Sequence, residues 1–252
     1  FEANVKIAKY RTVKQKDKEL FQLVFDLTPF YGESGGQVGD TGVMTGVVNG
    51  ENIQVIDTQK ENDLIIHYVD KLPQDTQQSF LVKVDETKRK LSMNNHSCTH
   101  LLHAALKQVL GNHVAQKGSL VNSELLRFDF SHFSKVTNEQ LLEIENIVNQ
   151  KIQENIELNE QRNVPINVAV DKLGATALFG EKYGDLVRVI TFDKDFSVEL
   201  CGGTHVKNTS EIRQFKILSE SSVAAGVRRI EAITNKKVEE FYKHIESQFN
   251  QI

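Results

Sequence analysis

The residues with the clearest potential for chemistry lie in two short segments that are far apart in the sequence. Residues 96–100 read HSCTH, and residues 201–205 read CGGTH. Each segment places two metal-binding side chains four positions apart, His96 with His100 and Cys201 with His205. Three imidazoles and one thiolate form a ligand set that suits Zn²⁺. A metal ion bound by both segments would lie where the fold brings them together.

The two pairs are expected to sit on different kinds of element. His96 and His100 lie in a helical pattern, where residues four apart are one turn apart and can share one metal ion. His103 shares that face but lies about 10 Å from His96 along the axis, which favours packing or support of the ligands. Cys98 is predicted to point into the core. Cys201 follows a strand, and the glycines after it permit a tight turn.

The spacing alone predicts a metal site and favours a structural role, because four protein ligands normally close the coordination shell of zinc. Position 97 is Ser, so the metalloprotease pattern with Glu beside the first His is absent. The deaminase pattern, which needs a nearby Glu and a Cys pair, is absent as well. With two cysteines, a Cys98–Cys201 disulfide is the alternative, but we favour a metal thiolate in a reducing compartment.

The composition is typical of a soluble globular protein with one large domain or two smaller ones, at 252 residues, 39% hydrophobic and 25% charged. No apolar run approaches the roughly 20 residues that span a membrane. The absence of an initial Met predicts a fragment of a longer protein. The net charge of −4 argues against a generally basic nucleic-acid binder. Local basic patches remain as candidates for RNA contact: Lys88–Lys90, Lys207 with Arg213 and Lys216, and Arg228 with Arg229.

The elements that must position these residues fall into regions of different character. Residues 1–85 show short alternating runs with turn signals, which predict a β-barrel or sandwich with strands near 5–8, 21–25, 53–56, 64–69 and 80–84. A glycine-rich run, residues 30–42, lies between them. From Asp85 onward the pattern predicts an antiparallel sheet covered by helices. The expected fold class is therefore α+β, with domains at 1–85 and 86–234 and the start of a C-terminal helical extension at 235–252.

In the second region the helical patterns begin at capping residues. We predict a short helix at 86–91 capped by Asp85, a second at 95–110 that stops at Gly111, and a third with a Thr137–Gln140 capping box. A short helix is expected at 171–178, and a charged one from Asn235 onward. Strands are expected around 128–130, 165–170, 186–192, 196–200, 214–219 and 227–233.

Five motifs in order resemble one protein family. Residues 95–106 (NHSCTHLLHAAL) and CGGTH resemble the two metal motifs of the alanyl-tRNA synthetase editing domain, and residues 30–42 resemble the glycine-rich motif of the preceding barrel. Residues 114–121 and 224–232 fit the same family. Free-standing alanyl-tRNA editing proteins share both domains. The threonyl-tRNA synthetase editing domain shares the metal motifs but has no counterpart of residues 30–42.

The resemblance implies a function, a cofactor and partners. It implies hydrolysis of mischarged Ser-tRNA(Ala) and Gly-tRNA(Ala), because a pocket for alanine rejects glycine and serine poorly and a second site must remove them. It implies zinc held by His96, His100, Cys201 and His205. The implied partners are the acceptor end of tRNA(Ala) and the remaining synthetase domains, in the cytoplasm and without a membrane. The alternative is a tRNA-binding module with a purely structural zinc and no hydrolase activity.

The resemblance also assigns roles to individual residues. Gln116 would lie near the substrate and act with Cys201 in catalysis, holding water or reading a serine hydroxyl, since an amide cannot serve as a general base. Gly35 and Gly36 would let a loop approach the substrate closely. Arg229 is assigned to substrate binding. Adjacent strand residues face opposite ways, so at most one of Arg228 and Arg229 can face the site.

Overall fold

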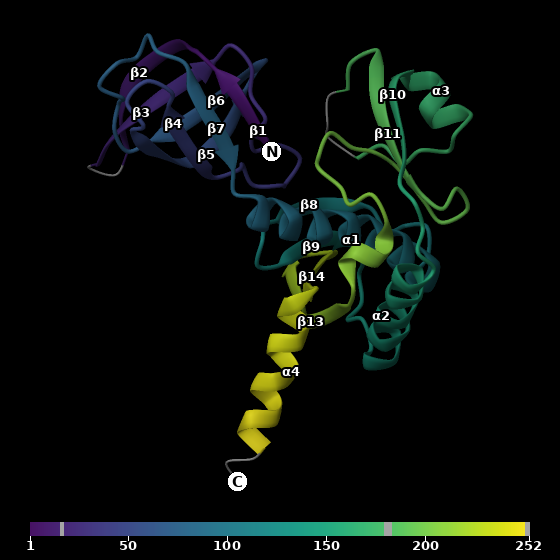
Figure 1. The fold of residues 1–252 in the computed structure, drawn as a ribbon. Coiled ribbons are helices and arrows are strands. Elements are labelled where there is room, and N and C mark those ends of the chain that lie inside the picture. The colour runs from purple at the N-terminus through teal and green to yellow at the C-terminus, as the bar shows by residue number, and fades with distance from the viewer. Residues whose placement is uncertain (16–17, 179–182, 250–252) are drawn as a thin grey trace. The chain divides into compact units, whose positions relative to one another are not determined.

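The computed structural model describes residues 1–15, 18–178 and 183–249 (Figure 1). The chain divides into two compact units, Phe1–Lys90 and Leu91–Ile252. The three-part division predicted from the sequence stays a prediction. Both units combine antiparallel sheets with helices or loops, in agreement with a mixed α and β fold.

The first unit is built on a seven-stranded antiparallel sheet in the order β1-β7-β4-β5-β6-β3-β2. Its strands alternate between buried and exposed side chains, as in β5, where Ile53 and Val55 are buried and Gln54 is exposed. Among the described residues no strand pairing joins β1 to β2, so the closed barrel predicted from the sequence is not confirmed. The strands are β1 (Glu2–Val5), β2 (Ile7–Gln15), β3 (Lys18–Phe25), β4 (Gly42–Gly46), β5 (Asn52–Glu61), β6 (Leu64–Val69) and β7 (Phe80–Val84).

The glycine-rich run between β3 and β4 contains a tight turn. Ser34 and Gln37 exchange two backbone hydrogen bonds, and Gly35 and Gly36 between them have φ angles of 58° and 85°. Two successive left-handed residues are the requirement of a hairpin turn that glycine meets without strain. A Cβ at Gly39 would lie 1.7 Å from the Thr58 carbonyl oxygen, so this position accepts no side chain.

The second unit has one main core. A four-stranded antiparallel sheet in the order β13-β14-β9-β8 shares this core with the apolar stripes of α1 and α2. A three-stranded sheet, β10-β11-β12, packs with α3 around a smaller core. The elements are α1 (Glu86–Leu110), β8 (Gln116–Val121), β9 (Leu126–Ser131), α2 (Asn138–Gln153), β10 (Asn159–Pro165), α3 (Ile166–Asp171), β11 (Leu186–Phe192), β12 (Ser197–Leu200), the 3-10 helix η1 (Thr209–Ile212), β13 (Phe215–Ala224), β14 (Val227–Thr234) and α4 (Lys236–Phe249).

The helix predictions are confirmed at their caps and wrong in two places. Asp85 accepts a hydrogen bond from the Lys88 backbone N–H, and Thr137 forms the predicted capping box with Gln140. However, the two helices predicted at 86–91 and 95–110 are the single helix α1. The polar residues between them are buried against the fold, and this packing outweighs their weak helix propensity.

The segment around Pro165 differs most from its prediction. The strand predicted at 165–170 instead ends at Pro165, and residues 166–171 form α3. Proline lacks the N–H that a continued strand ladder needs, which is consistent with the end of the strand at this residue. The helix predicted at 171–178 is absent, since α3 ends at Asp171 and turn and extended residues follow. No helix in the described part of the chain is long and apolar enough to cross a membrane.

Candidate metal centre

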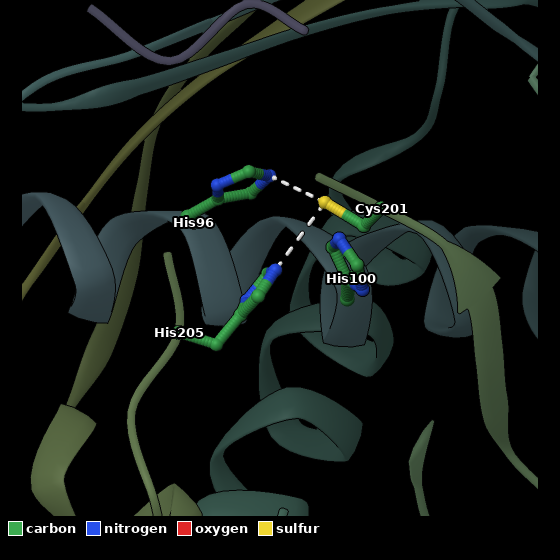
Figure 2. Close-up of side chains that lie close together, drawn as sticks. All are labelled: His96, His100, Cys201 and His205. Carbon is green, nitrogen blue, oxygen red and sulfur yellow. Dashed lines mark hydrogen bonds between the residues drawn. The ribbon is translucent and has the colours of Figure 1, made fainter. Parts of the chain in front are cut away.

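The four predicted ligands come together from α1 and from the loop after β12. One ligand atom from each of His96, His100, Cys201 and His205 lies within 4.8 Å of the others (Figure 2). His96 and His100 are one turn apart on the buried face of α1. The three histidines are buried and Cys201 is half-buried, so Cys201 is the most accessible of the four residues.

The distances and the chemistry of the donors fit a tetrahedral zinc site. The Cys201 Sγ lies 3.4 Å from the His96 Nε2 and 3.3 Å from the His205 Nε2. With bonds of about 2.3 Å to sulfur and 2.0–2.1 Å to nitrogen, a tetrahedral zinc ion would hold these atoms about 3.6 Å apart. A thiol has one proton and cannot donate to both nitrogens. A cation at the centre would satisfy both imidazoles and the sulfur together.

Burial keeps the imidazoles of the cluster neutral, which is the form that binds metal. Burial and the neighbouring His100 lower the pKa of His96 to about 3. Burial also lowers the pKa of His100, against the opposing effect of Glu199. The pKa of His205 lies well below its usual value for the same reason, with the other two rings contributing.

An arginine holds the loop that carries Cys201. The Arg188 Nη1 on β11 donates to the carbonyls of Cys201, at 3.0 Å, and Gly203. The Arg188 Nε donates to the Glu160 Oε1 at 2.9 Å, and this contact fixes the guanidinium. The Gly203 N–H in turn donates to the Cys201 Sγ at 3.4 Å. A Cβ at Gly202 would meet nothing within 4 Å, so the space beside this residue is open.

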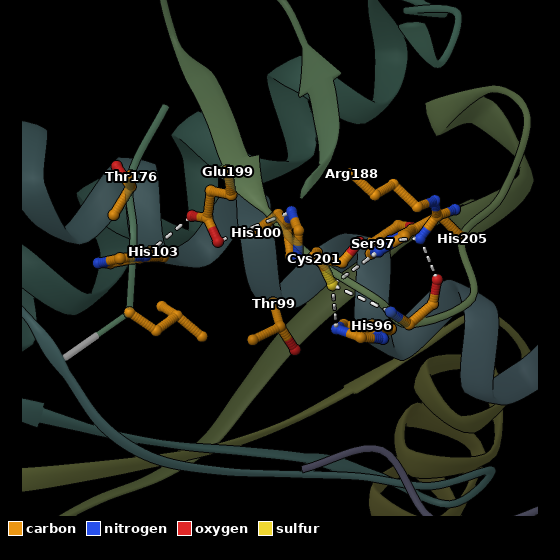
Figure 3. A network of polar contacts seen from close by, with 12 residues as sticks. His96, Ser97, Thr99, His100, His103, Thr176, Arg188, Glu199, Cys201 and His205 are labelled. Carbon is orange, nitrogen blue, oxygen red and sulfur yellow. Dashed lines mark hydrogen bonds and ion pairs between the residues drawn. The ribbon is translucent and has the colours of Figure 1, made fainter. Parts of the chain in front are cut away.

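Two further polar side chains contact imidazoles in the cluster and beside it (Figure 3). The Ser97 Oγ lies 3.1 Å from the His205 Nδ1 and accepts the Val206 N–H at 3.0 Å. Glu199 is buried and lies 2.8 Å from the His103 Nδ1. His103 therefore contacts a polar partner beside the cluster, and Cys98 is fully buried in the core as predicted.

Sequence reasoning missed Glu199 and Arg188. Glu199 lies on β12, two positions before Cys201, which follows the end of the strand. A carboxylate between Val198 and Leu200 in a buried strand needs a partner, and this was the available signal. Burial opposes its charge, but the His100 and His103 rings lower the pKa of Glu199 to about 2. Arg188 carried no comparable signal, because its partners in the ligand loop are backbone carbonyls.

The remaining predicted site residues do not join the cluster. Gln116 begins β8 opposite Phe130, and no hydrogen bond or ion pair of the described residues links its side chain to the ligands. Gly35 and Gly36 belong to the first unit, whereas the cluster belongs to the second. Arg229 forms a bidentate pair with Asp129, with both N···O distances at 2.7 Å. The roles predicted for these residues stay predictions.

The basic patches considered for RNA contact are largely ion-paired. Arg228 forms a bidentate pair with Glu220, one of several ion pairs on these patches. The others are Lys88–Asp85, Arg89–Asp40, Lys90–Glu86, Arg213–Glu239 and Lys216–Glu145. Pairing within the protein leaves these cations less available to phosphates, which favours a structural role for them.

Comparison with known proteins finds two matching families. Residues 2–88 match the family described as tRNA synthetases class II (A), and residues 187–231 match the threonyl and alanyl tRNA synthetase second additional domain. Alanine–tRNA ligase of Cytophaga hutchinsonii is 64% identical over 236 residues, which are 94% of the chain and 27% of that protein. The Bacteroides fragilis ligase is 58% identical over 245 residues, or 97% of the chain and 28% of that protein. The chain thus spans just over a quarter of these relatives' length.

Proposed function

The chain belongs to the alanyl-tRNA synthetase family, and we propose that it is the editing segment of an alanine–tRNA ligase. Its proposed reaction is hydrolysis of the ester in Ser-tRNA(Ala) and Gly-tRNA(Ala). Water adds at the acyl carbon, the 3′-terminal hydroxyl of the tRNA leaves, and serine or glycine is released. Such a step is needed because a pocket that accepts alanine discriminates weakly against one methyl group less or one hydroxyl more.

The observation that carries the proposal is the convergence of His96, His100, Cys201 and His205, with Cys201 the most accessible of the four. These residues would hold zinc, which as a Lewis acid polarises an ester carbonyl and lowers the pKa of water. The chain's own contribution is to keep three imidazoles neutral by burial. Arg188 fixes the carbonyls of Cys201 and Gly203, so the ligand loop keeps its shape when a substrate arrives.

Further residues complete the proposed site. Gln116 would orient water or the amino-acid side chain through its amide, without taking a proton. Gly35, Gly36 and Arg229 are proposed to contact the aminoacyl end, and Arg229 would do so while Asp129 fixes its guanidinium. The proposed partners are the acceptor end of tRNA(Ala) and the remaining domains of the ligase, and the proposed location is the cytoplasm.

A second candidate function is a tRNA-binding module with a purely structural zinc. The burial of three of the four ligands supports it, because closed zinc sites staple distant segments. In this case the metal joins α1 to the loop after β12 and performs no chemistry. Removal of zinc would then unfold the second unit, and hydrolysis would be absent in the folded, zinc-loaded chain.

Single-turnover deacylation separates the two functions. We expect fast loss of serine from Ser-tRNA(Ala), slow loss of alanine from Ala-tRNA(Ala), and inhibition by a zinc chelator. The assay should use both this chain and the full-length ligase that contains it, so that delivery of tRNA is not limiting. Full serine deacylation by a ligase with both Cys201→Ala and His205→Ala would contradict the proposal. Equal rates in wild type and Gln116→Ala would remove Gln116 from the mechanism.

A further inference from the structure

Glu199 occupies a special place beside the metal cluster. It lies on β12, is 6% exposed, and directs its two carboxylate oxygens at two different histidines of α1 (Figure 3). Its Oε1 is 2.8 Å from the His103 Nδ1, and its Oε2 is 3.7 Å from the His100 Nδ1. A buried carboxylate is costly to desolvate, so it persists where partners compensate for the lost water.

The His100 ring has an unmet requirement that Glu199 can meet. Its Nδ1 is buried and has no hydrogen-bond partner among the described residues. An imidazole that binds a metal through Nε2 carries its proton on Nδ1, and this N–H needs an acceptor. The nearest carboxylate oxygen is the Glu199 Oε2, and a normal hydrogen bond requires it to approach by about 0.8 Å.

We propose that Glu199 is a positioning residue that accepts the Nδ1–H of His100 and thereby fixes the tautomer and orientation of this zinc ligand. The inference rests on the proposed metal centre. His103 holds the other carboxylate oxygen through its own Nδ1–H, so the carboxylate cannot rotate away from His100. A charged acceptor also makes the imidazole a stronger donor to the metal than a neutral acceptor would.

His103 acts in this arrangement as a clamp on Glu199. Its Nδ1 faces Glu199, and its Nε2 is buried without a hydrogen-bond partner in the described part of the chain. A proton on Nδ1 and none on Nε2 fits both observations, because a protonated Nε2 would leave a buried donor unsatisfied. The role of His103 is therefore to hold the carboxylate that orients His100.

The decisive experiment measures zinc affinity by competition with a chromogenic chelator in the intact chain. Glu199→Gln keeps the size of the side chain but has one acceptor oxygen for two imidazole N–H groups. We expect its zinc affinity to fall about 10- to 100-fold. The matched control is Glu145→Gln, which removes a part-buried carboxylate bonded to Lys216 and should leave the affinity unchanged. Wild-type affinity in folded Glu199→Gln would overturn the inference.

A spectroscopic readout distinguishes positioning from a general effect on stability. In the zinc-loaded protein we expect a slowly exchanging, downfield Nδ1–H resonance of His100 in ¹H–¹⁵N spectra, present in Glu145→Gln and lost in Glu199→Gln. If Glu199→Gln does not fold, two variants of His103 replace it in the test. His103→Ala should lower zinc affinity several-fold, and His103→Asn, whose amide can donate at the same place, should recover most of it. Equal affinities in these two variants would contradict the clamp.

The controls also separate this inference from the proposed metal centre. If the wild-type chain binds no zinc, or if the His100→Ala variant binds zinc as tightly as wild type, the proposed metal centre is refuted. The inference about Glu199 is then refuted with it. If wild type binds zinc, His100→Ala does not, and Glu199→Gln binds as tightly as wild type, only the role of Glu199 is refuted.

Discussion

His67 in the first unit and the three histidines of the metal cluster in the second are all buried, yet their ring nitrogens meet opposite surroundings. The His67 Nδ1 donates to the Leu23 carbonyl at 3.2 Å, and its Nε2 accepts from the Thr28 hydroxyl at 2.8 Å. Each nitrogen of the neutral ring has one partner of the right kind. The rings of Phe25 and Phe30 enclose it, with centroids at 4.3 and 5.2 Å.

In the cluster the nitrogens converge instead of pairing off. The Nε2 atoms of His96 and His205 both face the Cys201 sulfur, and His100 offers a further ring nitrogen within 4.8 Å of these atoms. Burial lowers the pKa in both regions, so neither burial nor a shifted pKa identifies the functional histidines. Convergence of several donors on one point does, because protein hydrogen bonds alone cannot satisfy it.

The largest expected contrast between the two regions is in zinc affinity. His205→Ala removes one of four ligands from a site whose binding free energy is typically about 10–16 kcal/mol, so we expect a loss of at least about 100-fold. His67→Ala should leave the zinc affinity unchanged and destabilise the first unit. Chelator competition gives the affinities, and hydrogen exchange of β3 and β6 reports the stability. Zinc release by His67→Ala would break the comparison.

The next contrast is the pH dependence of stability in the first unit. Burial lowers the pKa of His67 from 6.5 to about 4, against the opposing hydrogen bond to Leu23. Between these pH values the unfolded state binds more protons than the folded state, so stability falls as the pH decreases from 6.5 toward 4. The contribution of His67 to the free energy of unfolding is fully present above pH 6.5. Acidification through the pKa of the folded state removes about 3 kcal/mol of it.

Denaturant unfolding at several pH values, followed through first-unit amides, measures this slope. His67→Gln cannot titrate, so it should remove this contribution to the slope even if it lowers the stability at all pH values. An unchanged slope in His67→Gln would assign the pH dependence to other groups. Zinc affinity at neutral pH provides the internal control. The His67→Gln variant keeps the ligand His205, so its zinc affinity should equal that of wild type.

A smaller and more selective contrast comes from two hydroxyl groups, each bonded to a buried imidazole. Thr28→Val leaves the His67 Nε2 without its donor and should cost about 1–2 kcal/mol in the first unit, with no effect on zinc. Ser97→Ala leaves the His205 Nδ1 without its partner and should lower zinc affinity about 10-fold. Both first-unit stability and zinc affinity should be measured in both variants. A loss of zinc affinity in Thr28→Val would contradict the expectation.

The sequence predicted the ligands better than their surroundings. His96 and His100 could be placed because helical periodicity fixes which residues share a face, and the capping residues Asp85 and Thr137 marked where helices begin. The approach of Cys201 to α1 depends on tertiary structure, which local patterns do not predict. It could be predicted only because the two motifs offer compatible metal ligands. Arg188 could not be found this way, because it acts on carbonyl groups that every residue has.

Backbone detail was harder to predict. Strand β8 was missed because its sequence, QKGSLV, lacks the alternation of apolar and polar residues that is typical of a half-buried strand. In the structure its side chains are mostly of intermediate burial. The single helix α1 was divided because Asn94 and Asn95 are weak helix formers, although both are buried in the fold. The sequence predicted close approach to the substrate at Gly35 and Gly36, and a tight turn at the glycines after Cys201. Their surroundings differ, and this difference leads to the smallest expected effect.

Gly35 in the first unit and Gly202 in the second both have open space where a Cβ would be, since nothing lies within 4 Å of either position. Gly35 has a φ angle of 58°, whereas the φ angle of Gly202 lies outside the left-handed region. Gly35→Ala should therefore cost about 1 kcal/mol of first-unit stability through backbone strain alone. Gly202→Ala should change second-unit stability by less than about 0.5 kcal/mol and leave zinc affinity within twofold. Thermal unfolding and chelator competition test both. If Gly202→Ala keeps its stability and its zinc but deacylates Ser-tRNA(Ala) slowly, the aminoacyl ester must approach the backbone at Gly202, and the open side of the cluster is its route of entry.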